Sequence, residues 1–163
     1  MVRVDKPFIL NAADARAHRR PRRAVTIDFE PDGTRWPDTG VNIQIMWPGQ
    51  PNCLYHSEPV QEDFLVLHGE CIAIVDGEER PLRRWDFFHC PAGTEHVFVG
   101  AGDGPCAVLM IGSRRLDRAH YPVNEVAAKY GASVEAATDD PAEAYADWRR
   151  EPRSEIENPW PLT

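Results

Sequence analysis

The sequence has no long hydrophobic run and little positive charge. No stretch of its 163 residues approaches the roughly 18 apolar residues that a membrane-spanning helix needs. The apolar run Phe8–Leu10 is too short for a signal peptide. Lys and Arg number 18 against 26 Asp and Glu, which gives a formal net charge of −8. Nucleic acids and anionic membranes both select basic surfaces, so we expect neither as a partner.

The sequence also lacks a C-x-x-C pair, because its four cysteines are widely separated. This absence argues against a zinc ribbon and against a thioredoxin-like redox site. We expect the cysteines to be small apolar strand residues in a reducing compartment. Together with the missing signal peptide, this predicts a cytoplasmic protein. The four residues are Cys53, Cys71, Cys90 and Cys106.

The first 40 residues are polar and basic, with weak periodicity, and we expect them to form an arm outside the main fold. The basic cluster Arg16–Arg23 is short, and we interpret it as a solvated segment rather than a nucleic-acid patch. Within this arm, Val25–Phe29 is a candidate strand.

From Val41 onward, short apolar runs alternate with clusters of Gly, Pro, Asn and Asp. This spacing predicts an all-β sandwich or barrel over about residues 41–112. Asp76-Gly77 is a hairpin signal, because both residues tolerate the positive φ of a primed turn. The expected strands are Val41–Trp47, Cys53–Ser57, Asp63–Leu67, Cys71–Val75, Trp85–Cys90, His96–Val99 and Ala107–Ile111.

Residues 113–163 have a different character and predict a short helical and extended tail. Apolar residues at helical spacing indicate a helix over Val123–Tyr130, with Gly131 as its stop. Asp140-Pro141 is a good start for a second helix over Ala142–Arg150, since Asp caps helices and Pro suits the first helical position. We expect one domain over residues 1–163.

Four side chains carry the chemical signal: His56, Glu58, Glu62 and His96. His56 and Glu58 are two residues apart, so on a strand they project from the same face. Glu62 opens the next strand, and His96 follows the turn Pro91–Glu95. Imidazole and carboxylate together suit Zn²⁺, Fe²⁺, Mn²⁺, Co²⁺ or Ni²⁺.

These residues resemble the two motifs of the cupin family. The first motif, G-x5-H-x-H-x3-4-E-x6-G, is matched by the segment His56–Glu62 and by Gly69, with Glu58 in place of the second His and Gly49 one residue too far upstream. The second motif, G-x5-P-x-G-x2-H-x3-N, is matched at its centre by Pro91–His96. There Trp85 replaces the leading Gly and Gly100 replaces the final Asn.

The resemblance implies a cupin double-stranded β-helix, a jelly-roll barrel of six to eight strands that is usually dimeric. It also implies one divalent metal ion held by His56, Glu62 and His96, with Glu58 at the place of the fourth ligand. Three interpretations of Glu58 remain open. It is a ligand in a harder, more anionic site that favours Fe²⁺ or Mn²⁺, or it is a nearby general base, or the metal site has decayed and the barrel binds an organic ligand.

Three function classes remain open, because a fold does not select a reaction. The first is a metal-dependent enzyme acting on a small organic acid or a phenolic or enolic compound. Dioxygenase-type chemistry is slightly favoured there, and isomerisation is the other reaction considered. The alternative is a non-catalytic small-molecule binding or sensor protein. The third is a structural barrel that acts through its dimer surface. We expect a homodimer with part of residues 1–45 at the interface.

Two further interpretations concern the interior. We expect His89 to be a buried core histidine. An inward apolar face that either lines a pocket or forms ordinary barrel core is predicted to contain Phe64, Val66, Phe98 and Leu109.

Overall fold

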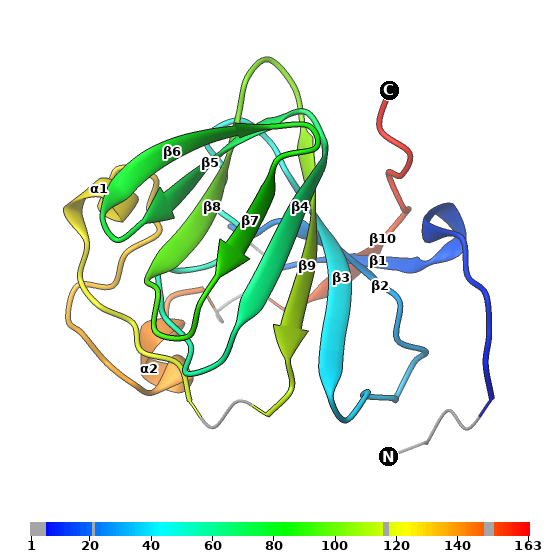
Figure 1. The fold of residues 1–163 in the computed structure, drawn as a ribbon, viewed down its shortest axis with the longest axis horizontal. Coiled ribbons are helices and arrows are strands. Elements are labelled where there is room, and N and C mark those ends of the chain that lie inside the picture. The colour runs from blue at the N-terminus through cyan, green and yellow to red at the C-terminus, as the bar shows by residue number, and fades with distance from the viewer. Residues whose placement is uncertain (1–5, 21, 116–117, 149–151) are drawn as a thin grey trace.

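The structure is a computed structural model, and it describes residues 6–20, 22–115, 118–148 and 152–163. Within them, all strand pairs are antiparallel and form two sheets (Figure 1), with the orders β10-β1-β2-β3-β9-β4-β7 and β6-β5-β8. This arrangement confirms the predicted all-β fold. The strands are β1 (Arg16–Arg19), β2 (Val25–Asp28), β3 (Thr39–Met46), β4 (Glu62–His68), β5 (Glu70–Val75), β6 (Glu78–Arg83), β7 (Phe87–Cys90), β8 (His96–Ala101), β9 (Cys106–Ser113) and β10 (Ser154–Ile156).

Helices are short and each spans about one turn. In the tail, α1 (Glu125–Ala128) lies inside its predicted window, and α2 (Pro141–Ala144) begins one residue before the predicted Ala142–Arg150. Both helices are shorter than expected, and positions 149 and 150 of the second window lie outside the described residues. The Asn124 side chain caps α1 by accepting hydrogen bonds from two backbone N–H groups, and Asp140 caps α2 in the same way with one. A single 3-10 turn, Ala12–Asp14, precedes β1.

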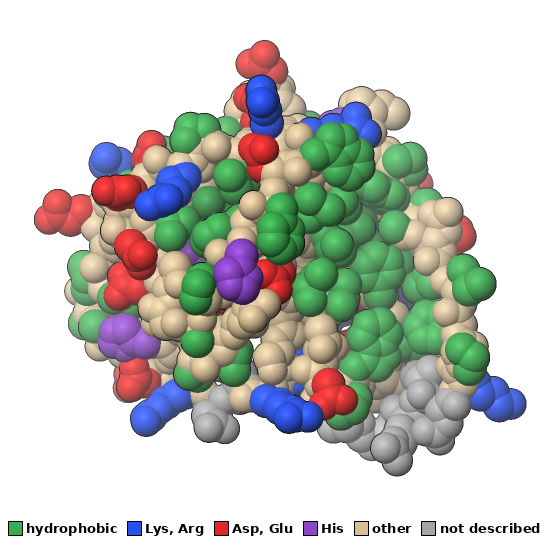
Figure 2. Space-filling view, viewed as in Figure 1, with side chains coloured by type: hydrophobic (Ala, Val, Ile, Leu, Met, Phe, Trp, Pro, Cys, Tyr) green, Lys and Arg blue, Asp and Glu red, His purple; other side chains and the backbone are tan. Residues whose placement is uncertain are grey.

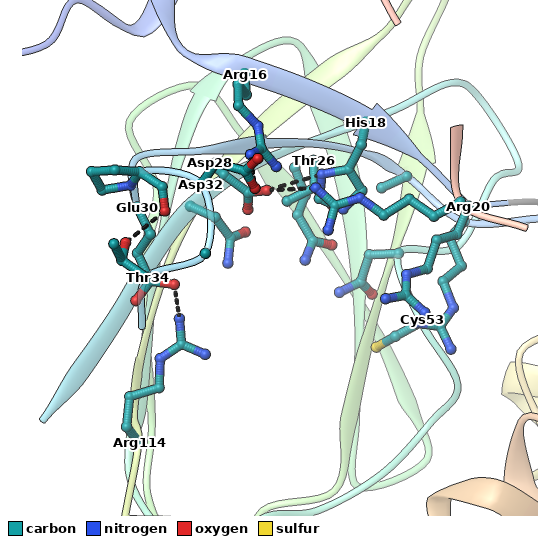
Figure 3. A pocket seen from close by; sticks show the side chains of 18 of the residues that line it. Arg16, His18, Arg20, Thr26, Asp28, Glu30, Asp32, Thr34, Cys53 and Arg114 are labelled. Carbon is teal, nitrogen blue, oxygen red and sulfur yellow. Dashed lines mark hydrogen bonds and ion pairs between the residues drawn. The ribbon is translucent and has the colours of Figure 1, made fainter. Parts of the chain in front are cut away.

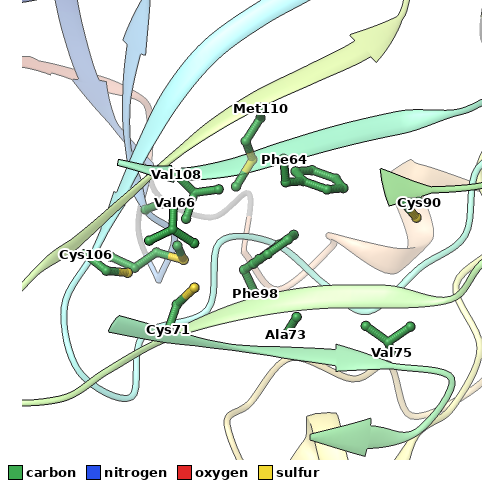
Figure 4. Packing of buried hydrophobic residues seen from close by; sticks show 12 residues of the cluster. Phe64, Val66, Cys71, Ala73, Val75, Cys90, Phe98, Cys106, Val108 and Met110 are labelled. Atoms are coloured by element: carbon green, nitrogen blue, oxygen red, sulfur yellow. The ribbon is translucent and has the colours of Figure 1, made fainter. Parts of the chain in front are cut away.

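The barrel interior is packed between the two sheets. Phe98 on β8 contacts Phe64 on β4, with their ring centroids 4.7 Å apart, and both side chains are buried. On β9 the inward residues are Val108 and Met110, so the prediction that Leu109 faces inward is wrong. Strand alternation sends Leu109 to the opposite face of the sheet. Figure 4 shows this cluster, which also contains Val66, Cys71, Ala73, Val75, Cys90 and Cys106.

A second apolar cluster covers the outer face of the larger sheet. It joins Val25 and Ile27 of β2 to Ile43 and Ile45 of β3, and the C-terminal Trp160 packs against it. The strands β1 and β10 extend this sheet beyond β2.

The N-terminal segment is therefore part of the sheet, and the prediction of a solvated basic segment is wrong for Arg16–Arg19. These residues form β1, in which Ala17 and His18 are buried. The basic composition led to a wrong prediction because alternate residues of this strand face different surroundings. One face packs against an apolar cluster and the other faces a polar interior.

Two local expectations have opposite outcomes. Asp76 and Gly77 have φ values of 49° and 80°, which confirms the predicted primed turn between β5 and β6. The segment Cys53–Ser57 is not a regular strand: it makes isolated bridges from His56 to His96 and from Ser57 to His120. In the described part of the chain, no helix combines the length and apolar character needed to span a membrane.

Candidate metal centre

His56 and His96 are placed side by side by a pair of backbone hydrogen bonds. The N–H of His56 donates to the carbonyl of His96 at 3.1 Å, and the N–H of His96 donates back at 2.8 Å. Residues paired in this way in antiparallel bridges direct their side chains to the same side. The two imidazole centroids are 4.9 Å apart.

A tight turn before β8 sets the position of His96. Gly93 has a φ of 83°, in the left-handed region that favours glycine, and it lets the chain reverse between β7 and β8. Its N–H donates to the carbonyl of Glu58 at 2.8 Å, and Thr94 N–H donates to Pro91 at 3.2 Å. The P-x-G turn thus ties the loop that carries Glu58 to the strand that carries His96.

Glu62 is the first residue of β4, where it lies between Cys90 on β7 and Gly112 on β9. Its Oε2 atom is 3.3 Å from Nε2 of His96. The next residue, Asp63, points to the other face of the sheet and pairs with exposed His89 at 2.7 Å. The prediction that His89 is a core residue is therefore wrong.

Three of the four predicted site residues form a compact group. One ligand atom from each of His56, Glu62 and His96 lies within 4.8 Å of the others. Glu58 is outside this group, although its Oε1 atom is 3.6 Å from Nε2 of His56. All four side chains are largely buried, with 3–17% of their surface exposed.

The backbone fixes which nitrogen of each histidine is available. Nδ1 of His56 lies 2.8 Å from the carbonyl of Leu54, and Nδ1 of His96 lies 3.1 Å from the carbonyl of Thr94. A carbonyl only accepts, so each Nδ1 must donate its proton. Both Nε2 atoms are then the ones that face the carboxylates, an arrangement typical of histidines that bind metal ions.

The electrostatics of this group favour added positive charge. Burial, and then the nearby charge of Glu58, raise the pKa of Glu62 to about 7. Burial alone would lower the pKa of His56, but its contacts with Cys53 and with both carboxylates raise it well above the usual value. Burial and the neighbouring charge of His56 lower the pKa of His96 to about 3, so its Nε2 keeps a lone pair.

The donor set therefore fits a divalent cation. The 3.3 Å contact of Nε2 of His96 with Oε2 of Glu62 is not an ordinary ion pair, because His96 is neutral, and it brings two hydrogen-bond acceptors together. A proton on Glu62 or a cation between the two atoms removes this conflict. Two imidazoles and a carboxylate are common ligands of first-row transition metals and zinc.

A cavity of about 370 Å³ adjoins the group, a size typical of small-molecule sites. Phe64 and Met110 line one side of it, and Tyr121 stacks on His56 with a centroid distance of 5.8 Å. The polar lining residues Asn42 and Gln44 were not predicted from the sequence. Their signal is visible on β3, where they alternate with Ile43 and Ile45, but the alternation does not say which face is the interior. Cys53, expected on a strand, also lines this cavity.

The fold and the site define the class of protein. Residues 42–112 match the family model described as the Cupin domain, so this segment of the chain is a cupin domain. No curated protein matches the chain.

Solved structures give the same fold. The polyketide cyclase RemF from Streptomyces resistomycificus is 14% identical, with a TM-score of 0.61 over 70% of this chain and 84% of that chain. A cupin 2 domain-containing protein from Halorhodospira halophila is 21% identical, with a TM-score of 0.53 over 66% and 74%. A sugar phosphate isomerase from Silicibacter pomeroyi is 27% identical, with a TM-score of 0.50 over 71% and 76%.

Proposed function

We propose that the chain is a metal-dependent enzyme that acts on a small organic substrate, with one divalent ion held by His56, Glu62 and His96. The observation that carries this proposal is the convergence of two Nε2 atoms and one carboxylate within 4.8 Å beside a cavity. Burying such groups without a counter-charge is costly, and a cation removes that cost.

Dioxygenase-type chemistry is the first reaction class for this site. Two histidines and one carboxylate with open positions are typical of non-haem iron(II) oxygenases. A bound iron ion would supply the activation of O₂, and a dioxygenase reaction places both oxygen atoms in the product, so it would require no external reductant. The chain's own contribution is to orient the substrate in the cavity and to limit the access of water through the aromatic wall of Phe64 and Tyr121.

Isomerisation by proton transfer is the second candidate, and the position of Glu58 favours it. Its carboxylate lies outside the three-residue group but only 3.6 Å from His56 and on the cavity wall. A base in this place accepts a proton from a substrate whose carbonyl is polarised by a metal ion. The sugar phosphate isomerase described above is named for a reaction of this type.

Metal analysis of protein purified without chelators tests the proposal. We expect about one equivalent of a transition metal in the wild type and its loss in the His56→Ala, His96→Ala double variant. His89→Ala is the matched control, because His89 is exposed and belongs to the opposite face of β4 and β7. Equal metal content in the double variant and the control contradicts the proposal.

Turnover then separates the reaction classes. Oxygen uptake by the iron-loaded protein with a panel of small acids and enols supports the dioxygenase. Exchange of a substrate C–H proton with solvent, without oxygen uptake, supports the isomerase. Bound metal and bound ligand with neither reaction indicate a binding protein.

We also propose that the protein is a cytoplasmic homodimer with part of residues 1–45 at the interface. Three exposed large apolar residues in this segment support the dimer. They are Phe8, Ile9 and Leu10. Figure 2 shows that hydrophobic side chains also gather over β3, β4 and β9. The four cysteines are all free thiols, as a reducing compartment would keep them. A monomeric mass by light scattering at micromolar concentration contradicts the dimer.

A further inference from the structure

The interior of the barrel has a polar half that the metal centre does not use. On β3, Ile43 and Ile45 pack into the outer apolar cluster, so Asn42 and Gln44 face inward. The same alternation on β2 and β1 turns further polar residues inward. Figure 3 shows the resulting cavity, of about 620 Å³, whose lining includes Arg16, His18, Arg20, Thr26 and Asp28.

Two side-chain carboxamides in this half have an oxygen atom without a hydrogen-bond partner among the described residues. The oxygen atoms Oδ1 of Asn42 and Oε1 of Gln44 are buried and accept no hydrogen bond from the described residues. Buried polar atoms in folded proteins are normally paired with protein, water or ligand. Both residues line the cavity beside the metal centre as well as the second cavity. They are therefore placed to bind hydroxyl groups of a molecule that extends from one cavity into the other.

Arg23 stands at the junction of the two cavities and carries an available positive charge. Its guanidinium stacks on the ring of Tyr145 at 3.7 Å and lies 5.4 Å from the ring of Trp148. Among the described residues it forms no ion pair with a carboxylate. Stacking holds the planar group in place while leaving its N–H edge free to donate two parallel hydrogen bonds to an anion.

The acidic residues of the second cavity do not cancel this charge, because each has a cationic partner of its own. Glu30 pairs with Arg114 at 2.9 Å, and Asp28 pairs with Arg153 at 3.4 Å. Asp32 pairs with Arg16. Of the two carboxylates at the metal centre, Glu62 belongs to the three-residue group and Glu58 lies 3.6 Å from Nε2 of His56.

We propose that the two cavities form one binding site for a small compound that carries several hydroxyl groups and one anionic group, either a carboxylate or a phosphate. One end of the compound lies at the metal centre, its hydroxyl groups bind to the carboxamides of Asn42 and Gln44, and its anionic group binds to Arg23. This inference rests on the proposed function for one point, which is that one end of the compound lies at the metal centre. The contacts with the other three residues do not depend on metal.

Calorimetric titration of the full chain tests the site, once with zinc and once without metal. The anionic probes are gluconate and glucose 6-phosphate, which distinguish a carboxylate from a phosphate. Glucitol carries hydroxyl groups without charge, and hexanoate carries charge without hydroxyl groups. We expect one of the anionic polyols to bind about tenfold or more tightly than glucitol and hexanoate, as one charge-assisted interaction allows.

Three variants assign the contacts. Arg23→Met should weaken binding of the anionic polyol by about tenfold or more while leaving glucitol binding within about twofold, which also shows that the site is folded. Gln44→Leu should weaken the binding of both the anionic polyol and glucitol. Arg83→Met is the matched control, because Arg83 is exposed on β6 in the other sheet and lines neither cavity.

The outcomes separate this inference from the proposed function. Equal affinity of the Arg23→Met and Arg83→Met variants for the anionic probes overturns the inference, and so does the absence of binding of both probes at millimolar concentration. Binding that depends on Arg23 in a protein that holds no metal supports the inference while contradicting the metal-dependent function.

Discussion

His56 and His96 exchange both of their backbone hydrogen bonds, and this exchange joins a loop to the first residue of β8. β8 belongs to the three-stranded sheet, whereas Glu62 belongs to β4 in the larger sheet. A metal ion bound to all three residues would therefore connect the two sheets directly.

Metal removal should accordingly lower the thermal stability of the protein. At a free metal concentration about 100 times the dissociation constant, binding adds about 2.7 kcal/mol to the free energy of unfolding. For a chain of this size, that corresponds to a rise of about 5–10 °C in the melting temperature. Calorimetry with and without a chelator measures it, and the His56→Ala, His96→Ala double variant should show no change on chelation.

The two carboxylates should contribute unequally to metal affinity. Glu62 belongs to the three-residue group and Glu58 does not. We expect Glu62→Ala to weaken metal binding by about 100-fold or more, and Glu58→Ala by about tenfold or less. Competition with a chelating dye measures both constants. An equal loss in the two variants would make Glu58 a fourth ligand.

Stability should depend on pH through Asp28. Burial opposes its ionisation, but the contact with His18 and nearby arginine charges outweigh burial and hold the pKa of Asp28 below its usual 3.8. The folded protein thus binds this proton less tightly than the unfolded chain. The stabilisation is complete above about pH 4 and is lost as the pH falls through the lowered value.

The variant Asp28→Asn should therefore be less stable than the wild type by about 1–2 kcal/mol at pH 7. The difference between the two proteins should shrink below pH 4. Urea unfolding at several pH values measures it. Asp103→Asn, in an exposed loop between β8 and β9, is the control and should not change stability.

Truncation of Phe98 should be costly because its side chain is fully buried. Phe98→Ala removes the contact with Phe64 and leaves a cavity between the two sheets, so we expect a loss of about 3–5 kcal/mol in the free energy of unfolding. Phe87→Ala is the control, since 62% of Phe87 is exposed, and it should change stability by about 0.5 kcal/mol or less. Similar losses in both variants would contradict the described packing.

Gly69 should tolerate alanine less well than Gly49. Both have positive φ, 67° and 79°, so alanine pays about 1–2 kcal/mol for the left-handed backbone at either position. At Gly69 a Cβ would also lie 2.5 Å from the carbonyl oxygen of Pro105, whereas Gly49 has open space. Thermal melting of the two variants should therefore show the larger loss for Gly69→Ala.

Local sequence patterns were sufficient for the central strands and for the three-residue group. The strands β4, β5, β8 and β9 lie within one or two residues of the predicted runs, because each run is apolar and bounded by turn residues. The motif spacing identified His56, Glu62 and His96 but not the distance of Glu58 from the group. That distance depends on the path of the loop after His56, which local patterns do not encode.

The strands that the sequence analysis missed depend on distant partners. β6 is polar and contains Pro81, and it is held as an edge strand by its pairing with β5. β1 and β10 are short, and neither has a clear strand pattern. Their pairing, with Ala17 opposite Ile156, joins segments near the two ends of the chain.

The pairing of β1 with β10 also has a consequence for the order of folding. During synthesis, β1 leaves the ribosome early, but its outer edge cannot be covered until residues 154–156 have followed. Contacts between such distant segments form slowly, because a long loop must close first. An uncovered strand edge is a template for pairing with other chains. The nascent protein is therefore prone to aggregation in the interval before residues 154–156 are made, and chaperones that bind exposed strands would act in that interval.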